Sequence, residues 1–264
     1  MTNSSHQYDT IQRPYDYIRT SSIALIERSN VHSALTPYIH NARILELACG
    51  SGFYTHAFQT WGAQSVLGVD ISTVMISSAP RLANISYMQG DCSIPTPYFR
   101  DEDEAFDIVF AAWLLNYAGD RRGLVDMFRN IAMNLKEGGR FVGVTVPPTS
   151  DPRGSVSAEA SARPMSRGGS GYLVYEHIRD VEEGIYFRVR GDTPVGELEF
   201  ECYHLRREVY EECAREAGLK GKLEWGVTEV PERWLRGEGE GGASLQELES
   251  YREIPNYGIL VIEK

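Results

Sequence analysis

Short apolar runs alternate with amphipathic stretches over residues 43–146 of the chain. The runs predict strands at about 43–48, 65–70, 85–89, 106–112 and 139–146. Before the last of them, Met127, Ile131 and Leu135 stand four residues apart in turn, which is helical spacing. Strands that alternate with helices in this way predict an α/β fold with a doubly wound sheet.

The segment before the first strand predicts a polar arm followed by a helix. Residues 1–12 are mainly polar, and the apolar positions after them recur at helical spacing. Those positions are Ile23, Ile26, Val31, Leu35 and Ile39. Further on, Pro80 lies in an otherwise helical segment, so we expect that helix to kink or end early.

The pattern changes after Val144. Residues 147–171 are rich in Pro, Gly and Ser, which predicts a long mobile loop. Three runs rich in β-branched and aromatic residues follow, at 172–178, 184–190 and 197–205, and they predict antiparallel strands. The chain then continues with a helix at 206–217 that ends at Gly218, a hydrophilic loop at 237–244 and a last strand at 257–263.

These patterns divide the chain into four parts. We expect an N-terminal helical arm or lid at 1–40, a ligand-binding core at 41–146, an inserted loop and antiparallel β cap at 147–205, and the C-terminal part of the core sheet at 206–264. The cap thus follows the fifth strand of the core.

The turn after the first strand carries the clearest chemical signal. The strand residues 44–47 lead directly into a turn with Gly50 and Gly52, and an amphipathic segment begins at once. Glycines there allow the backbone to approach a ligand that lies at a helix N-terminus. Asp70 ends the next strand, about 20 residues on, where a carboxylate can hold a ribose diol.

The same turn excludes two common nucleotide sites. A dinucleotide fold would place a third glycine at the helix start, where this chain has Thr55, and no Gly-Lys-Ser/Thr sequence is nearby. An adenosine that carries an amino-acid tail in place of a phosphate chain fits the turn, and S-adenosylmethionine is such a ligand.

The order of the motifs resembles that of class I S-adenosylmethionine-dependent methyltransferases. The matching segments are 46–52, 70–71, 90–92, 106–112 and 135–141. The resemblance implies a Rossmann-like, doubly wound, seven-stranded sheet with S-adenosyl-L-methionine as cofactor and S-adenosyl-L-homocysteine as product. The antiparallel β cap would be an insertion after the fifth strand.

The resemblance also implies the cofactor-binding positions, which are Tyr8, Arg19, Glu46, Ala48, Gly50, Gly52, Tyr54, Asp70, Ile71, Met75, Asp91, Cys92, Ala112 and Trp113. Glu46 would receive the ammonium group, Asp70 the ribose hydroxyls, and Asp91 with the Cys92 backbone the adenine. A side chain at either glycine would collide with the cofactor. Structural alternatives stay open: a helix cap at Asp70 and solvated surface positions for Asp91 and Arg19.

A finer resemblance is to the toxoflavin-biosynthesis type of small-molecule methyltransferase. It rests on Tyr8, Tyr15 and the run Leu-Leu-Asn-Tyr-Ala at 114–118. Trp113 stands where the resemblance leads us to expect tyrosine. The expected acceptor pocket contains Tyr8, Tyr15, Trp113, Asn116 and Tyr117. Trp113 and Tyr117 are four residues apart, so a helical turn would let them stack together on a flat acceptor, although buried aromatics are commonly core residues.

The candidate catalytic residues are Tyr15, Trp113, Tyr117, His177 and His204. The chain shows no His-plus-acid pair at a recognisable spacing and no carboxylate cluster for a divalent metal, which favours N-methylation of a heteroaromatic secondary metabolite by positioning. O-methylation with His177, His204 or a tyrosine as base is the alternative. A third possibility is a non-methylating cyclase or regulatory subunit that binds the same cofactor.

Composition narrows the partners. The formal net charge is −11 and the pI is about 5.1, which argues against a nucleic-acid substrate and favours a small-molecule acceptor. The four cysteines form no Cys-x-x-Cys pair, so neither disulfides nor a zinc site is indicated. No apolar run is long enough for a membrane span. We therefore expect a cytoplasmic monomer or homodimer that does not bind membranes.

Overall fold

The computed structural model describes residues 7–101, 104–157, 163–165, 171–239 and 242–264. Within them a seven-stranded sheet has the order β10-β11-β5-β4-β1-β2-β3. Its strands are β1 Arg43–Leu47, β2 Ser65–Asp70, β3 Ile85–Gln89, β4 Phe106–Ala112, β5 Leu135–Thr145, β10 Leu223–Val227 and β11 Gly258–Glu263. Strands β1 to β5 are parallel to one another, and β11 runs antiparallel to β5. The prediction of a Rossmann-like α/β fold is therefore confirmed.

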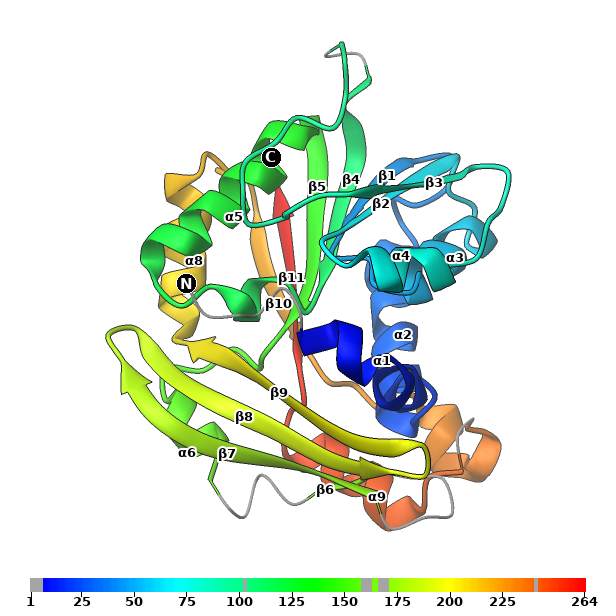
Figure 1. Cartoon of the computed structure of the whole chain (residues 1–264), viewed down its shortest axis with the longest axis vertical. Coiled ribbons are helices and arrows are strands. Elements are labelled where there is room, and N and C mark those ends of the chain that lie inside the picture. The colour runs from blue at the N-terminus through cyan, green and yellow to red at the C-terminus, as the bar shows by residue number, and fades with distance from the viewer. Residues whose placement is uncertain (1–6, 102–103, 158–162, 166–170, 240–241) are drawn as a thin grey trace.

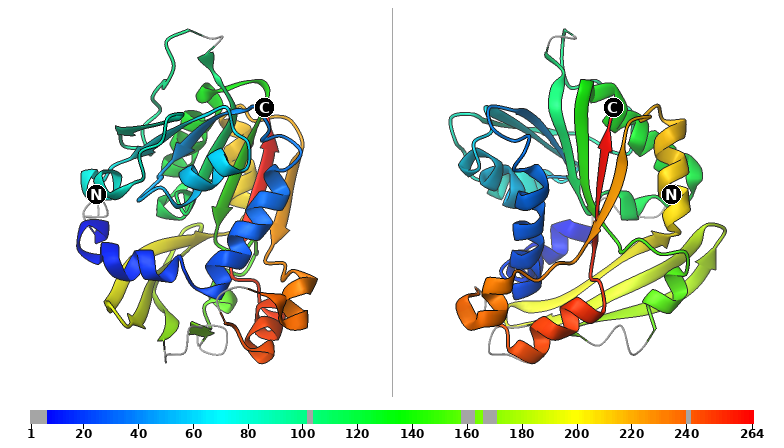
Figure 2. Two further views of the ribbon diagram at one scale, coloured as in Figure 1. Left: turned by 90° about the vertical axis from the view of Figure 1, so that its right-hand side faces the viewer. Right: turned by 180° about the vertical axis from the view of Figure 1, so that it is seen from behind.

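Helices cover both faces of this sheet (Figures 1 and 2). The α-helices among the described residues are α1 Gln7–Ile18, α2 Ser22–Leu35, α3 Phe53–Thr60, α4 Thr73–Ser78, α5 Arg121–Asn134, α6 Pro152–Ser155, α8 Arg207–Glu216 and α9 Leu245–Glu253. Alternate residues of β1 serve the two layers: Leu45 and Leu47 pack with α5, whereas Ile44 packs with α2 and α3. Glu46 therefore lies on the side of α2 and α3, among apolar residues.

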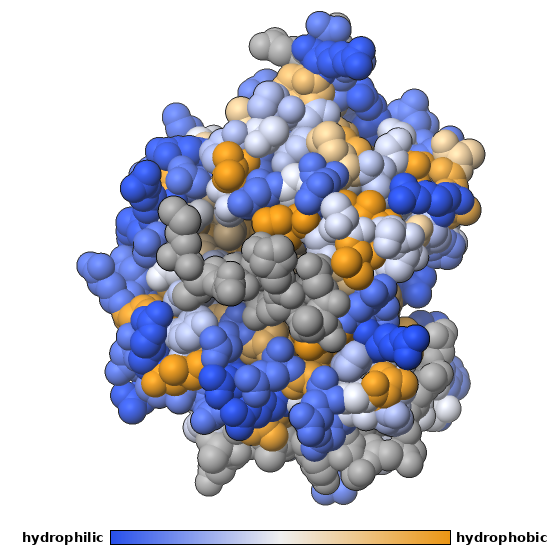
Figure 3. Space-filling model, viewed as in Figure 1, coloured by the Kyte–Doolittle hydropathy of each residue, from blue (hydrophilic) through white to orange (hydrophobic). Residues whose placement is uncertain are grey.

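A second, four-stranded antiparallel sheet follows the fifth strand, in the order β6-β7-β8-β9. Its strands are β6 Arg163–Met165, β7 Gly171–Val181, β8 Gly184–Thr193 and β9 Gly196–Leu205. The predicted antiparallel β cap is confirmed. Figure 1 shows the cap beneath the core sheet, with α1 between them. The face drawn in Figure 3 is mainly hydrophilic with scattered apolar residues.

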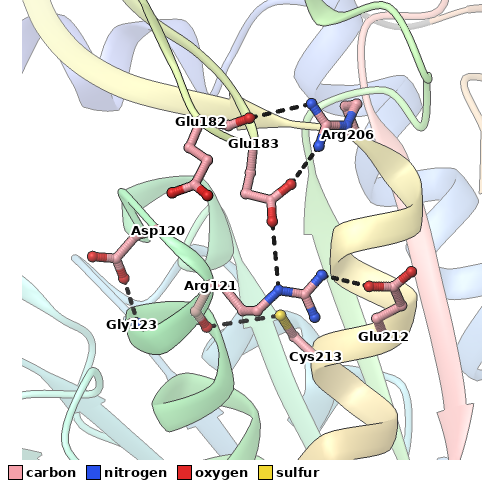
Figure 4. Close-up of polar contacts among 8 residues, drawn as sticks. All are labelled: Asp120, Arg121, Gly123, Glu182, Glu183, Arg206, Glu212 and Cys213. Carbon is pink, nitrogen blue, oxygen red and sulfur yellow. Dashed lines mark hydrogen bonds and ion pairs between the residues drawn. The ribbon is translucent and has the colours of Figure 1, made fainter.

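Ion pairs join one end of the cap to the core helices (Figure 4). Glu183, in the β7–β8 turn, receives the guanidinium groups of Arg121 from the start of α5 and of Arg206 from the end of β9. Arg121 also pairs with Glu212 of α8. The side chain of Glu183 is only 17% exposed, whereas that of Glu212 is 59% exposed. Glu183 is thus the member of this network that the fold shields most.

Several helix limits follow from the sequence as expected. Helix α4 ends before Pro80, and its N-cap is Ser72, whose hydroxyl accepts a hydrogen bond from the Met75 amide at 3.1 Å. Helix α8 is followed by Gly218, which has φ +99°. Helix α5 stops at Asn134, because Leu135 already has extended backbone angles and begins β5. The prediction that Leu135 belongs to the helix was wrong.

Residues 7–12 belong to α1. Two loop predictions were wrong in part. In the predicted mobile loop, 152–155 form α6, whose N-cap Asp151 accepts a hydrogen bond from the Gly154 amide at 3.1 Å, and 163–165 form β6. The described part of the predicted loop at 237–244 includes the end of a π-helical turn, Trp234–Glu238. Neither β10 nor α9 was predicted.

Candidate functional site

The glycine turn sits at the carboxyl end of β1 and uses left-handed backbone angles three times. Ala48 has φ +56°, Gly50 +54° and Gly52 +83°. The Gly50 amide donates a hydrogen bond to Oδ2 of Asp70 at 2.8 Å, and the Ser72 amide donates to Oδ1 of Asp70 at 2.9 Å. Asp70 therefore holds the turn after β1 to the start of the helix after β2.

Gly52 is required by the protein itself. A Cβ there would lie 2.8 Å from the Tyr87 hydroxyl and 3.1 Å from Pro80. At Gly50 the nearest atom to a Cβ is Cε of Met75 at 3.8 Å, which is ordinary contact. A side chain at Gly52 would therefore meet Tyr87 within the protein, in a backbone conformation that favours glycine, and its collision with the cofactor stays a prediction.

Glu46 is a buried carboxyl group next to this turn. It is 2% exposed and accepts a hydrogen bond from the Thr55 hydroxyl of α3. Burial raises the pKa of Glu46 to about 8, although the Thr55 hydrogen bond and the nearby Arg19 oppose that rise. A buried carboxyl with so little compensation fits a ligand that brings a positive charge, such as an α-ammonium group.

Asp91 and Cys92 have different environments. Asp91 is exposed and accepts hydrogen bonds from the Ser93 amide at 2.9 Å and from its hydroxyl at 2.6 Å. Cys92 is buried, and its sulfur lies 3.4 Å from the Ala48 amide nitrogen. Burial raises the pKa of the Cys92 thiol to about 12, so it stays protonated and packs beneath the turn.

The remaining predicted cofactor positions are divided between surface and core. Ile71 is 40% exposed, directly after β2. Met75 is buried below Gly50, and Ala112 is the half-buried last residue of β4. Tyr54 is fully buried, and its hydroxyl points to Glu27 at 2.7 Å. The side chain predicted at Tyr8 lies outside the described residues.

Helix α1 lies against the glycine turn. The Ser51 hydroxyl donates a hydrogen bond to Oδ1 of Asp16 at 2.7 Å. One turn later the chain reaches Arg19, whose guanidinium lies 3.1 Å from Oε1 of Glu27 and stacks 4.2 Å above the Phe53 ring. Arg19 is therefore paired within the protein and is not a solvated surface residue.

A cavity opens between the cap, α1 and the end of β4. Its volume is about 140 Å³, close to the ~150 Å³ of an apolar cavity that admits a benzene ring. It is lined by Tyr15, Ile18, Arg19, Ile23, Ala24, Glu27, Trp113, Asn116, Tyr117, Val146, Pro147, Ser155, Val156, Leu173, Tyr175, Phe187, Val189, Phe200, Cys202, His204, Tyr251, Pro255, Asn256 and Tyr257.

The structure brings Tyr15, Trp113, Asn116, Tyr117 and His204 to this cavity. Trp113 and Tyr117 do not share an α-helical turn as we expected, because Trp113 has φ +61° and a short 3-10 helix, Leu115–Tyr117, follows it. Both side chains nevertheless line the same space. Burial raises the pKa of Tyr15, so its hydroxyl stays protonated.

The two cap histidines have separate positions. His204 is 2% exposed, its Nε2 donates to the Pro147 carbonyl at 2.8 Å, and burial lowers its pKa to about 4. His177 is not among the lining residues, and its Nε2 lies 2.9 Å from Oδ1 of Asp180. Of the two histidines, the structure places only His204 at the cavity.

Most of the cavity wall was not predicted from the sequence. The cap supplies Tyr175, Phe187 and Phe200, which lie on one face because residues alternate along β7, β8 and β9. The alternation of residues along these strands could have been used to predict which side chains face the cavity. Tyr251 and Tyr257 reach the wall from α9 and the segment before β11, where the sequence pattern contains no such signal.

Residues 44–139 match a family model described as a methyltransferase domain. The match covers less than half of the chain. The matched range covers the glycine turn, Asp70 and the β4 end, and it stops before the cap. The fold of this range is that of class I methyltransferases, whose cofactor is S-adenosylmethionine. In the described chain no helix is both long and apolar enough to cross a bilayer.

Curated relatives match only part of the chain. A ubiquinone biosynthesis O-methyltransferase of Nitrobacter winogradskyi is 32% identical over 128 residues, 48% of this chain and 48% of the relative. The chain thus spans about half the length of this curated relative.

Solved structures match the fold over most of the chain. A Mesorhizobium loti S-adenosylmethionine-dependent methyltransferase matches with TM-score 0.57 and 20% identity over 89% of this chain and 96% of its own. CalS10, an amino pentose methyltransferase of Micromonospora echinaspora, matches with TM-score 0.54 and 18% identity over 96% and 97% of the two chains. At these identities the likeness concerns the fold alone.

Proposed function

We propose that this protein transfers the methyl group of S-adenosylmethionine to a small molecule bound in the cap cavity. The observation that supports this most is the position of Trp113. It directly follows the last residue of β4, beside the carboxyl-end edge of the sheet, and it also lines the cavity. The cofactor motifs and an aromatic pocket therefore meet at one residue.

The residues present fit the cofactor. Buried Glu46 would hold the ammonium group, the Gly50 turn would lie along the methionine part, and Asp70 would accept the ribose hydroxyls. Asp91 and the Cys92 backbone would lie near the adenine. When bound, S-adenosylmethionine supplies an electrophilic methyl group whose leaving group is a neutral thioether.

The chain's own contribution is to orient the acceptor. Trp113 and Tyr117 offer flat surfaces for stacking, and the cap residues Phe187 and Phe200 keep water away from the acceptor. Alignment of nucleophile and methyl group can contribute roughly 7–11 kcal/mol in well-oriented systems. A nitrogen lone pair needs little more, so we favour N-methylation of a heteroaromatic metabolite.

The ionisation of the lining groups supports this preference. Burial lowers the pKa of His204 to about 4 and raises the pKa of Tyr15, so neither group is matched to proton removal near neutral pH. Asn116 and Tyr117, from the run at 114–118 that resembles the toxoflavin-biosynthesis type, line the cavity together with Trp113. That type of enzyme is the finer family assignment that we propose.

O-methylation is the second candidate, and His204 is the observation that favours it. Because Nε2 donates to the Pro147 carbonyl, the ring carries its lone pair on Nδ1, which can accept a hydroxyl proton. The O-methyltransferase relative supports this candidate.

We propose the small-molecule acceptor, the cytoplasmic setting, the absence of nucleic-acid and membrane partners, and a monomeric or homodimeric state on the sequence arguments above.

Isotope-labelled S-adenosylmethionine tests the proposal. The full chain is incubated with heterocyclic N–H, phenolic and thiol acceptors, and labelled products are identified by mass. We expect label on a ring nitrogen, and Glu46→Gln should reduce the yield. Label only on hydroxyls would replace N-methylation by O-methylation. No labelled product and no S-adenosylhomocysteine with any acceptor, despite cofactor binding by calorimetry, would support a non-methylating cyclase or regulatory subunit.

A further inference from the structure

Two side chains at the cavity have a hydrogen-bond acceptor that no described residue uses. Asn116 is 1% exposed, lines the cavity, and its Oδ1 is unpartnered. His204 is 2% exposed and uses Nε2 for the Pro147 carbonyl, while Nδ1 makes no hydrogen bond with any described residue. Buried polar atoms are normally hydrogen bonded, so a partner beyond the described residues is indicated, and a bound ligand can supply it.

Both atoms accept hydrogen bonds. The Asn116 side chain hydrogen bonds with Cys202, and its carbonyl oxygen Oδ1 can only accept. For His204, a carbonyl partner at Nε2 requires the proton on that nitrogen, which leaves a lone pair on Nδ1. Burial lowers the pKa of His204 to about 4, so this neutral tautomer prevails near pH 7. The complementary ligand group is therefore a donor, N–H or O–H.

Among the described lining residues, none offers an unpaired charge to a ligand. The cavity's cation, Arg19, is already paired with Glu27 at 3.1 Å, and both groups line it. Around them the wall is mainly apolar and aromatic, with Trp113, Phe187 and Phe200 among its members. A carboxylate or an ammonium group on the ligand would lose its hydration without a counter-charge, which is unfavourable.

We propose that the cavity selects an uncharged ring compound that donates a hydrogen bond from N–H or O–H to Asn116 Oδ1, to His204 Nδ1 or to both. This selection rests on the proposed function, since it concerns the acceptor of that reaction. The proposed selection is more specific than the proposed function, because it states which ring compounds bind and which two residues distinguish them.

The test compares indole with benzofuran, which has the same shape but an oxygen in place of the N–H group. Each is titrated into the full chain loaded with S-adenosylhomocysteine, and affinity is measured by calorimetry. Indole should bind at least about tenfold more tightly, since one unmet buried hydrogen bond is worth about that factor. Asn116→Leu and His204→Phe should each reduce the ratio, and the double variant should bring it close to one.

His177→Phe is the matched control, because this cap histidine does not line the cavity, and it should leave the ratio unchanged. If His204→Phe fails to fold, His204→Gln retains a donor for the Pro147 carbonyl and His204→Asn retains an acceptor near Nδ1. The Gln variant should lower the ratio and the Asn variant should preserve it.

Equal affinities for indole and benzofuran, or no binding of either at millimolar concentration, would overturn the proposal. An unchanged preference in the double variant would overturn it as well. Failure of the proposed function looks different: selective indole binding with no methyl transfer to any acceptor would leave the selection intact and remove the reaction.

Discussion

The indole nitrogen of Trp113 donates a hydrogen bond to Oε2 of Glu27 at 3.0 Å. The other oxygen of Glu27 receives the Tyr54 hydroxyl at 2.7 Å and Arg19 at 3.1 Å. One carboxylate of α2 thus joins the arm, the helix after the glycine turn and the cavity wall. Trp113 has φ +61°, and its amide donates to the Val144 carbonyl at 2.7 Å. We conclude that Glu27 positions the Trp113 ring.

Glu27→Ala should lower the free energy of unfolding by about 3–5 kcal/mol, since it leaves Arg19 buried without its counter-charge. Glu27→Gln keeps an acceptor for Trp113 and should cost less. Chemical denaturation measures both. A double-mutant cycle with Trp113→Phe then isolates the indole hydrogen bond, and a coupling energy near zero would contradict a positioning role for Glu27.

The core fold was predictable because its signals are local. The β1 strand, the glycine turn and Asp70 follow one another within residues 43–70, and each has its own pattern. Helix α1 contains Pro14 and contacts the glycine turn through the hydrogen bond between Asp16 and Ser51. This contact joins segments 35 residues apart, so the local pattern does not predict it.

The cavity was predictable only in part, since most of its wall comes from distant segments. Glu27 and Trp113 are 86 residues apart, and no periodicity relates them. Strand β10 is half exposed at a sheet edge and contains Gly226, so it lacks the apolar run of a buried strand. Tyr251 reaches the cavity because α9 packs against Ile26 of α2, a contact that no local pattern predicts.

The pH dependence of stability should report on Glu46. Its folded pKa of about 8 lies above the ordinary 4.5, so the folded state holds the proton more tightly than the unfolded chain. The contribution of Glu46 to the free energy of unfolding of the cofactor-free protein should therefore fall between pH 4.5 and pH 8, by more than about 1.4 kcal/mol. Glu46→Gln should flatten this part of the profile in denaturant titrations.

Cofactor binding should release a proton from the same group. An ammonium group pairs with the carboxylate form, so the affinity for S-adenosylhomocysteine should rise as the pH approaches 8. Calorimetry at pH 7 in buffers of different ionisation enthalpy measures the release. The Glu46→Gln variant should bind S-adenosylhomocysteine more weakly and without this proton release. If the variant released as many protons as the wild type, the released proton would come from another group.

His204 should affect stability in the opposite direction. Its folded pKa of about 4 lies below the ordinary 6.5, so its contribution is complete above pH 6.5 and is lost as the pH falls toward 4. Wild type should lose about 1–3 kcal/mol of unfolding free energy over this range through His204. His204→Gln should lose less, whereas His177→Gln should follow the wild type.

The two glutamates of the ion network at the cap end, Glu183 and Glu212, should contribute unequally to stability (Figure 4). Glu212→Gln removes an exposed pair and should change stability by less than about 1 kcal/mol. Glu183→Gln should cost more, because this shielded carboxylate receives both Arg121 and Arg206. Thermal unfolding in low and high salt measures the two variants, and equal effects would show that burial does not distinguish them.

Gly52→Ala tests the close approach of Tyr87 to the turn, with Gly138→Ala as its control. Both glycines have positive φ, +83° and +72°, so alanine pays a similar backbone penalty of about 1–2 kcal/mol at each. Only at Gly52 does the new Cβ meet the Tyr87 hydroxyl, at 2.8 Å, whereas nothing lies within 4 Å of it at Gly138. Gly52→Ala should therefore lose a further 1–3 kcal/mol or so of unfolding free energy. Adding Tyr87→Phe should recover part of that loss, because it removes the atom in the way, and no recovery would mean that the backbone angle alone requires this glycine.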